Sequence, residues 1–205
     1  ALVTLAKTLS GSAAEGLLLR TALINGIERA NQSVIDLGIG AATTLAVIEL
    51  QDHTVRPYHV GDSMILAIGQ RGKMKLQTVS HSPVGFAVES GMLNEREAMH
   101  HEDRHIVSNV IGMPEMRLEV GSTLELAQRD TVLIASDGLF DNLRTDEISA
   151  RVRVGPIQQA ADRLLADSLR RMEKHWEGQP HKPDDLTFIV FRPGKVTGKP
   201  SEQAA

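Results

Sequence analysis

The stretch Thr131-Val132-Leu133-Ile134-Ala135-Ser136 is the clearest strand signal in the chain, and it stops at Asp137-Gly138. A continuous apolar run of this length is typical of a strand that is buried on both faces. The carboxylate of Asp137 then stands at the exit of a rigid strand, and Gly138 lets an ion or a phosphate approach the backbone closely. An Asp-Gly pair after a strand can also be no more than a turn.

Shorter runs rich in Val, Ile, Leu and Thr surround this stretch and predict further strands. The polar residues Gln51-Asp52-His53 separate two of these runs and indicate an antiparallel hairpin. The predicted strands cover Thr43–Leu50, Val55–Ala67, Met74–Val79, Arg117–Val120 and Leu186–Phe191.

Two segments have the spacing of amphipathic helices. The first covers about 14–30, with a stripe of Leu19, Leu23, Ile27 and Ala30. The second runs from Pro156, which suits the first helical position, to Trp176. Its expected buried residues are Ile157, Ala161, Leu164, Leu165, Leu169 and Met172. Because the strands outnumber the helices and occur in runs, we expect an α+β fold in which helices cover antiparallel sheets.

Residues 81–112 are irregular and polar, with Asn94 as a candidate helix N-cap. We expect this segment to form a peripheral flap that is more mobile than the strands. Residues 194–205 are rich in Gly, Pro, Lys and Ser and have nothing to bury. The sequence therefore predicts one domain over 1–193, followed by a disordered tail.

The composition is that of an ordinary soluble globular protein, with 41% hydrophobic and 23% charged residues among 205. A net charge of −4 disfavours a nucleic-acid partner that is held through its phosphates. The absence of cysteine excludes disulfides, thiolate zinc sites and a cysteine nucleophile. No apolar run approaches the roughly 18 residues that span a bilayer, and no signal peptide is recognisable. We therefore expect a cytoplasmic protein with no membrane partner.

Three aspartate positions are candidates for chemistry. Asp62 falls inside a predicted strand, where an unpaired acid would be costly, unless a bulge at Gly61 turns it to solvent. Asp184 directly precedes the last predicted strand, although a Pro-Asp-Asp loop is also ordinary turn chemistry. Together with Asp137 they form an oxygen-rich, thiol-free set that suits hard cations such as Mg²⁺ or Mn²⁺.

These motifs resemble those of the type 2C serine/threonine protein phosphatases, and they occur in the same order. The strings are Gly61-Asp62-Ser63, Ala-Ser-Asp-Gly-Leu-Phe-Asp at 135–141, and an acidic pair before Leu-Thr-Phe-Ile-Val at 184–190. Residues 40–44 also resemble a Gly-Ser/Ala-Thr stretch that opens one strand of that family. The likeness runs from about Leu17 to Pro193. It implies a sandwich of two antiparallel β-sheets flanked by helices, with a metal cluster at one end.

The resemblance also implies roles for single residues. Asp137 matches the aspartate that binds a core metal, and Asp184 matches the acid of a closing Asp-Asn pair whose second place is taken here by Asp185. Asp62 matches an aspartate that helps to bind a further, weaker metal. The implied function is hydrolysis of phosphoserine or phosphothreonine in a protein substrate, with two core Mg²⁺ or Mn²⁺ ions, and a third in some members, activating a water molecule.

The chain also departs from the family. It contains neither the Asp-Gly-His-Gly-Gly segment, which supplies a bridging aspartate and a candidate general acid, nor the earlier acidic segment with a phosphate-holding Arg. Met113 stands where eukaryotic members often carry another aspartate. We therefore expect a fold that is incomplete at the N-terminus and nearly inactive by itself, even if the full-length parent is an enzyme. The alternative is a catalytically degenerate, phosphatase-like binding or regulatory module.

A third function, that of a zinc peptidase, comes from the H-E-x-x-H pattern of residues 101–105. This pattern would place His101 and His105 one helical turn apart. Both intervening residues are charged, however, and the preceding helix is short and polar. An exposed flap segment is therefore the favoured interpretation, and we expect His81 to be structural too.

Overall fold

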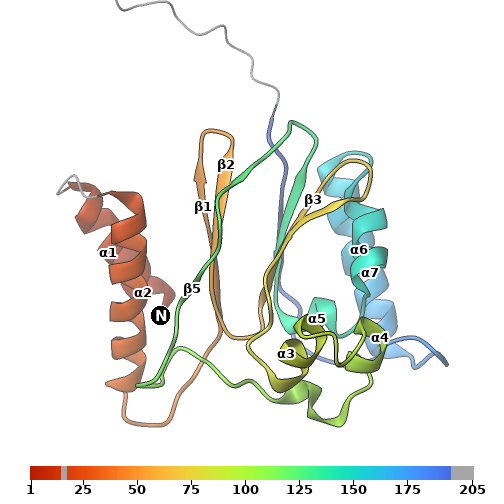
Figure 1. Ribbon diagram of the computed structural model, residues 1–205, viewed down its shortest axis with the longest axis horizontal. Coiled ribbons are helices and arrows are strands. Elements are labelled where there is room, and N and C mark those ends of the chain that lie inside the picture. Colours follow the sequence, from red (N-terminus) through yellow and green to blue (C-terminus); the bar gives the residue numbers. More distant parts are fainter. Residues whose placement is uncertain (15–17, 195–205) are drawn as a thin grey trace, which may run out of the picture.

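Two antiparallel sheets lie face to face between two pairs of helices in the computed structural model, which describes residues 1–14 and 18–194 (Figure 1). One sheet is covered by α1 (Leu2–Ala14) and α2 (Leu19–Ile35). The other is covered by α6 (Thr145–Val152) and α7 (Ile157–Glu173). This arrangement confirms the predicted α+β sandwich.

All of the strand pairs are antiparallel, as the short polar turns predicted. The first sheet consists of β1 (Leu45–Gln51), β2 (Thr54–Val60), β5 (Glu119–Val120) and β6 (Leu124–Glu125). In it, β2 pairs with the three other strands. The second sheet has the order β4-β3-β7-β8 and consists of β3 (Met64–Ile68), β4 (Met74–Gln77), β7 (Thr131–Ala135) and β8 (Phe188–Phe191).

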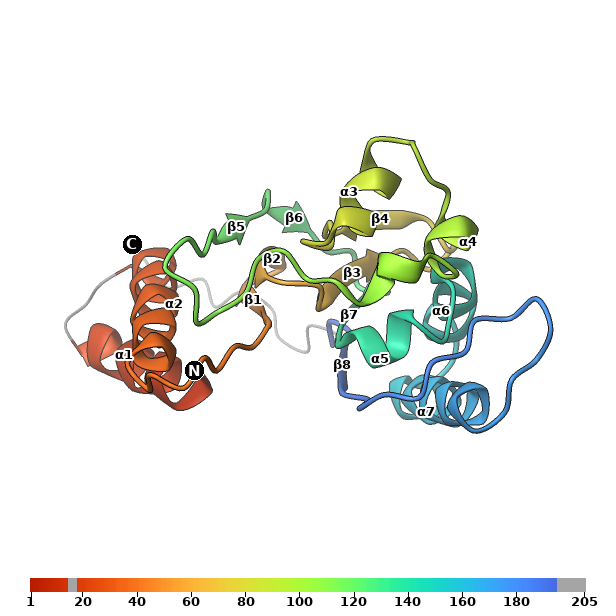
Figure 2. The same cartoon turned by 90° about the horizontal axis from the view of Figure 1, so that it is seen from below.

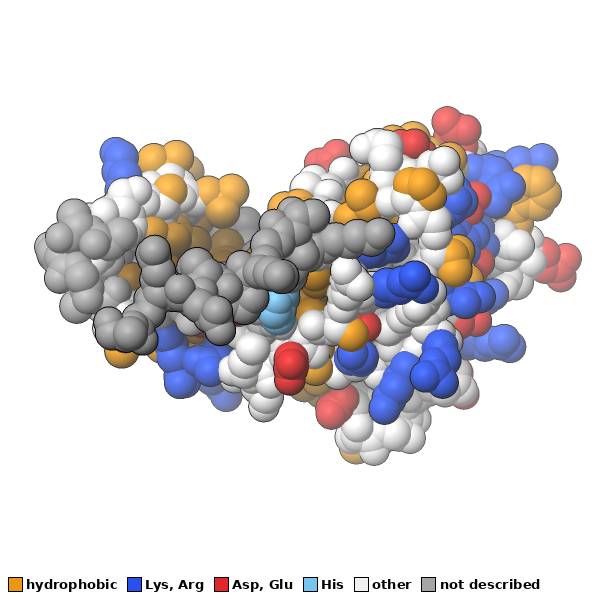
Figure 3. All heavy atoms as spheres, turned by 90° about the horizontal axis from the view of Figure 1, so that it is seen from above, with side chains coloured by type: hydrophobic (Ala, Val, Ile, Leu, Met, Phe, Trp, Pro, Cys, Tyr) orange, Lys and Arg blue, Asp and Glu red, His pale blue; other side chains and the backbone are white. Residues whose placement is uncertain are grey.

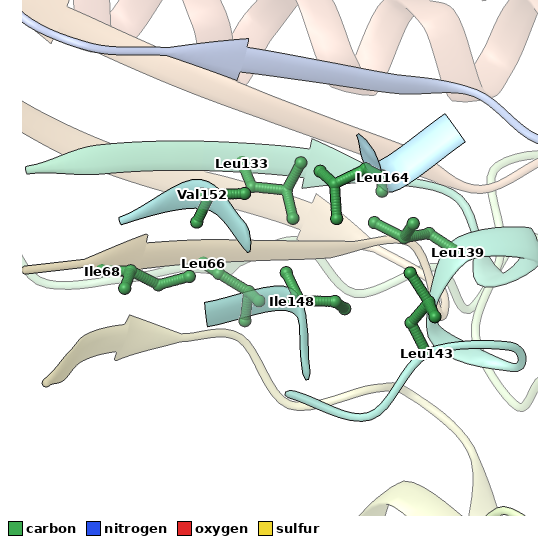
Figure 4. Close-up of a cluster of buried hydrophobic side chains, with 9 residues drawn as sticks. Leu66, Ile68, Leu133, Leu139, Leu143, Ile148, Val152 and Leu164 are labelled. Carbon is green, nitrogen blue, oxygen red and sulfur yellow. The ribbon is translucent and has the colours of Figure 1, made fainter. Parts of the chain in front are cut away.

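The central strand β7 is buried on both faces, as its apolar run predicted. Leu133 packs with Leu164 and other apolar side chains under α6 and α7 (Figure 4). Val132 and Ile134 point the other way, into the core between the two sheets. Because β7 is fixed from both sides, the residues that directly follow it are held in a defined position.

The single strand predicted over 55–67 is in fact two strands that belong to different sheets. The chain turns at Gly61, which has φ +104°, and a Cβ there would lie 2.4 Å from the Thr44 Cγ2 atom. Only glycine fits this conformation and this close approach. Asp62 therefore lies in the connection between β2 and β3, not in the interior of a strand.

The helix predictions were correct in kind but wrong in detail. The first predicted helix is α2, which begins five residues later than expected, and α1, α5 (Asp137–Phe140) and α6 were not predicted. In α7 the buried residues are Ala160, Leu164, Ser168 and Arg171, whereas Leu165 and Leu169 are each 44% exposed. Arg171 is buried because it pairs with Glu147 at 2.6 Å, and an apolar pattern cannot reveal such a partner.

Residues 81–112 lie at one end of the sandwich, beside α5 (Figures 1 and 2). They contain α3 (Pro83–Glu89), α4 (Glu95–Ala98) and a 3₁₀ turn over Glu102–His105. Asn94 caps α4 as predicted, accepting a hydrogen bond from the Glu97 N–H at 3.0 Å. The predicted tail over 194–205 lies outside the described residues, except for Gly194.

The end of the sandwich opposite α5 carries many basic side chains. Figure 3 shows that Lys and Arg side chains gather there on the half of the molecule that carries α6 and α7. These cations therefore lie away from the end that holds α5. None of the described helices is long and apolar enough to cross a membrane.

We predict that the backbone amides of residues 81–112 exchange with deuterium faster than those of β7. Short helices at the periphery have few buried contacts to break on local opening, whereas β7 lies inside two cores. Hydrogen-exchange mass spectrometry on the 205-residue chain measures this. Equal protection of the two segments would contradict the flap assignment.

Candidate metal centre

The exit of β7 carries two of the acidic side chains. The strand ends at Ala135, and α5 begins two residues later at Asp137. Asp141 follows one helical turn on, where its N–H donates to the Asp137 carbonyl at 2.7 Å. Residues four apart in a helical turn share a face, so both carboxylates project from the same side of α5.

A third carboxylate, that of Asp184, arrives from the loop before β8. Because β8 runs antiparallel to β7, its first residue Phe188 lies opposite Ala135. The start of one strand thus meets the end of the other. Oxygens of Asp137, Asp141 and Asp184 all lie within 4.8 Å of one another. Asp137 and Asp184 therefore lie close together at one end of the sandwich, where the sequence resemblance implied a metal cluster.

Gly138 makes this meeting of the two segments possible. A Cβ on Gly138 would lie 2.3 Å from the Asp185 carbonyl oxygen, which is far inside van der Waals contact. The backbone N–H of Ser136 also donates to the Thr187 carbonyl at 3.0 Å. The two loops are therefore packed backbone to backbone, and the absence of a side chain at Gly138 sets their spacing.

A lysine ammonium lies among the three acids. The Lys182 Nζ is 3.2 Å from Asp137 Oδ2, 2.6 Å from Asp141 Oδ2 and 3.1 Å from Asp184 Oδ2. Its side chain is only 21% exposed. One cation thus partly balances three clustered negative charges.

The environment shifts the pKa values of these groups in different directions. Burial raises the pKa of Asp141, although Lys182 opposes this shift. Burial also disfavours the ionised form of Asp184, but the hydrogen bond and charge of Lys182 together with the hydrogen bond from the Asp185 N–H outweigh it, so the pKa of Asp184 is lowered. Burial disfavours the ammonium form of Lys182, yet its bonds to Asp141 and Asp184 raise its pKa.

Asp62 lies near this cluster but is not one of its three members. It lines the same pocket of about 370 Å³ as Asp137 and Asp141. Its pKa is raised by burial and by the negative charge of Asp137. The structure therefore places all three sequence-predicted site residues at one end of the sandwich, with Asp62 outside the group of three acids.

The geometry of the cluster fits a divalent cation. Oxygen ligands of Mg²⁺ or Ca²⁺ lie roughly 2.0 to 2.6 Å from the ion, so ligands on opposite sides of it are about 4 to 5 Å apart. The oxygens of Asp137, Asp141 and Asp184 lie within 4.8 Å of one another, which is close enough for all three to bind one ion. Three carboxylates and no thiol form a donor set for a hard cation.

The Protein phosphatase 2C family model matches residues 3–176. The chain belongs to this family. It is 32% identical over 140 residues to a putative protein phosphatase 2C-type of Streptococcus pyogenes, a match that covers 63% of this chain and 54% of the relative. The chain spans about half the length of the curated relatives it matches.

Solved structures of the family have the same fold. The PPM Ser-Thr phosphatase MsPP from Mycobacterium smegmatis, in complex with cacodylate, is 28% identical with a TM-score of 0.74, covering 94% of this chain and 81% of that one. The catalytic domain of PstP in complex with two manganese ions is 21% identical with a TM-score of 0.63, covering 91% and 78%. At that identity the second match shows the fold alone.

The sequence did not assign a role to Asp141 or Lys182. Asp141 ends the motif at 135–141, and its spacing of four from Asp137 is a helical signal that could have identified it. Lys182 gave no such signal, because a lysine in a Pro-rich loop is usually solvated. Only the meeting of the two loops in the type 2C fold places it among the acids.

A second group of potential ligands, formed by His59, His81 and Glu119, is better explained as structural. The His81 Nδ1 accepts from the Gly61 N–H at 3.1 Å, so the ring carries its proton on Nε2, which faces Glu119 at 3.1 Å. A metal at Nε2 would have to displace that proton while Nδ1 remained an acceptor, which a neutral imidazole cannot satisfy. His81 thus anchors the flap to β2 and β5, in line with its expected structural role.

The H-E-x-x-H pattern does not form a zinc helix. His101 is the N-cap of a 3₁₀ turn, and its Nδ1 accepts from the Asp103 N–H at 3.1 Å. A 3₁₀ turn has three residues per turn, so positions four apart do not share a face. Within 1–14 and 18–194, neither His101 nor His105 belongs to a group of three potential metal ligands.

We predict that Gly138→Ala weakens the metal centre and destabilises the domain by about 1 to 3 kcal/mol, the usual cost of overpacking. The new methyl group would collide with the Asp185 carbonyl and push Asp184 away from Asp137. Urea unfolding measures the stability and calorimetry measures Mn²⁺ affinity. Gly11→Ala is the control, because no atom outside its own helix lies within 4 Å of a Cβ there. Unchanged Mn²⁺ affinity in Gly138→Ala would show that this close approach does not set the site.

Proposed function

We propose that the protein which carries this chain removes phosphate from phosphoserine or phosphothreonine in protein substrates and depends on Mg²⁺ or Mn²⁺. The observation that carries the proposal is the convergence of Asp137, Asp141 and Asp184 at one end of a type 2C sandwich. Two manganese ions in the PstP catalytic domain and the phosphatase names of the relatives support it.

In this proposal Asp137 and Asp184 hold a core cation, Asp141 supports them, and Asp62 helps to hold a weaker accessory cation. Bound divalent ions supply a water of lowered pKa and an electrophilic clamp for the phosphoryl oxygens. The rigid exit of β7 keeps the Asp137 oxygens in place. The candidate general acid and the phosphate-holding Arg of the family are not among these 205 residues, so catalytic turnover needs further family segments.

The pocket beside the cluster is the proposed place for the substrate peptide. Its walls include Val84, Val88 and Met99 from the 81–112 segment and Phe140 from α5. If the phosphorylated side chain of a substrate peptide reached the three carboxylates, the peptide residues on either side of it would lie between the flap and α5. In this position the flap, which is part of the predicted 1–193 domain, would contribute to substrate binding.

A phosphatase-like binding module remains the second candidate, and one observation favours it. Lys182 already places a positive charge among the three acids, where the leading proposal needs divalent ions. A module of this kind would bind a phosphoprotein or another partner without turnover. Metal-dependent activity separates the two candidates.

We expect the product of the complete gene to cleave a phosphothreonine peptide only with Mn²⁺ or Mg²⁺, and chelation with EDTA to abolish the activity. The uncatalysed hydrolysis of phosphate monoesters is extremely slow, so loss of the cations removes most of the stabilisation of the transition state. Release of inorganic phosphate measures the rate, and the 205-residue chain, expected to be nearly inactive, is assayed beside it. Turnover that persists in EDTA would refute the metal-dependent mechanism.

In the same protein, Asp137→Asn should lower kcat on the order of a thousandfold, because a neutral amide weakens both cation affinity and the lowering of the water pKa. Asp62→Asn should cost less and be partly rescued by excess Mn²⁺, because Asp62 lies outside the three-acid group. Steady-state kinetics over a range of Mn²⁺ concentrations measures both effects. An Asp137→Asn enzyme that keeps most of its rate would rule out this assignment.

A further inference from the structure

We propose that Lys182 is a tethered cation that competes with the divalent metal, so that metal loading of the centre requires its ammonium group to leave. The inference rests on the proposed function only in taking Asp137, Asp141 and Asp184 as the metal site. It assigns to Lys182 the role of setting the metal concentration at which this site fills.

The first argument is the position of the ammonium group. Its Nζ lies 2.6 to 3.2 Å from the Oδ2 atoms of all three acids. A divalent ion would lie roughly 2.0 to 2.6 Å from the same kind of atoms. Two cations cannot share the space between three oxygens that are themselves within 4.8 Å of one another. Metal and ammonium therefore exclude each other.

The second argument is that the fold places Lys182 there. The side chain of Asn142 holds the Lys182 backbone from both sides, accepting from its N–H at 2.9 Å and donating to its carbonyl at 2.8 Å. Asn142 is fully buried, and its own carbonyl accepts a hydrogen bond from Arg171 at 3.2 Å. Because the backbone of Lys182 is fixed in this way, the side chain projects from a defined position. It therefore loses less conformational entropy when its ammonium group reaches the acids.

The third argument concerns charge. Three clustered carboxylates repel one another, and the nearby Asp62 adds to the negative charge. Another cation at this end, Arg104, donates to the carbonyls of Met99 and His181, not to the three acids. Lys182 therefore stabilises the centre without metal, and a divalent ion gains only the difference between its own attraction to the acids and that of the ammonium. Removing the lysine should strengthen metal binding and weaken the metal-free fold.

The test is Lys182→Met, which keeps an unbranched side chain only one atom shorter and removes the charge. Calorimetric titration of the 205-residue chain with Mn²⁺ should show at least tenfold tighter binding in the variant. Its melting temperature should be lower than that of the wild type in EDTA and should recover when Mn²⁺ is added. Lys182→Arg, which keeps the charge, should bind Mn²⁺ within about threefold of the wild type.

Lys75→Met is the matched control. Lys75 also pairs with a buried acid, Asp130, but this pair lies at the opposite end of β7 from Asp137. Its loss should lower the melting temperature and leave Mn²⁺ affinity unchanged. Equal or weaker Mn²⁺ binding in Lys182→Met, or no binding by either protein, would overturn the proposal.

Two further results separate this inference from the proposed function. If the complete protein shows metal-dependent turnover while Lys182→Met leaves Mn²⁺ affinity unchanged, only the role of Lys182 fails. If Lys182→Met gains affinity but the complete protein never turns over, only the enzymatic function fails. Should Lys182→Met not fold, Mg²⁺ titration of ¹³C-lysine-labelled wild type decides, because the Lys182 Cε resonance must shift as the site fills.

Discussion

The antiparallel pairing of β7 with β8 is the constraint on which the candidate metal centre depends. It sets the end of one strand against the start of the other, with Ala135 opposite Phe188. Asp137 and Asp184 are 47 positions apart in the sequence, yet each is only a few residues from this pair. A shift in register would separate the two acids and also turn Leu133 away from its core. The hydrophobic packing and the site are therefore fixed by the same strand pair.

The close approach of the two loops has an electrostatic cost, because it brings negative charges together. A positive charge on one of the same loops offsets this cost. Bringing Asp137, Asp141 and Asp184 within 4.8 Å creates a site that needs positive charge. Here the same loop that delivers Asp184 also delivers Lys182, two residues earlier. The buried Asn142 binds the Lys182 backbone and the Gly138 carbonyl at once, so it links both loops. The three acids, the Lys182 ammonium group and Asn142 thus form one connected unit.

Much of this arrangement was predictable from the sequence, and the reasons for success and failure are physical. β7 was identified because burial on both faces requires an unbroken apolar run, and Asp137 because it directly follows that run. A bulge at Gly61 was one of the two interpretations, but the change of sheet there was missed because apolar strands on either side of a glycine look continuous when positive φ cannot be seen. The buried face of α7 was misplaced because Arg171 is buried by an ion pair that joins it to Glu147.

Lys182 shows most clearly where sequence reasoning ends. Its environment comes from residues 137 and 141, which follow β7, and from residue 184, which precedes β8, so no local pattern encodes it. The family resemblance pointed to Asp137 and Asp184 because these positions match a family motif. It assigned no role to Lys182, because this residue lies outside the matched positions. If the three acids bind a metal as proposed, one neighbouring side chain would then change the metal affinity while the acids themselves stay the same. Metal affinity in this fold then depends on the charge that the loops supply as well as on the ligands themselves.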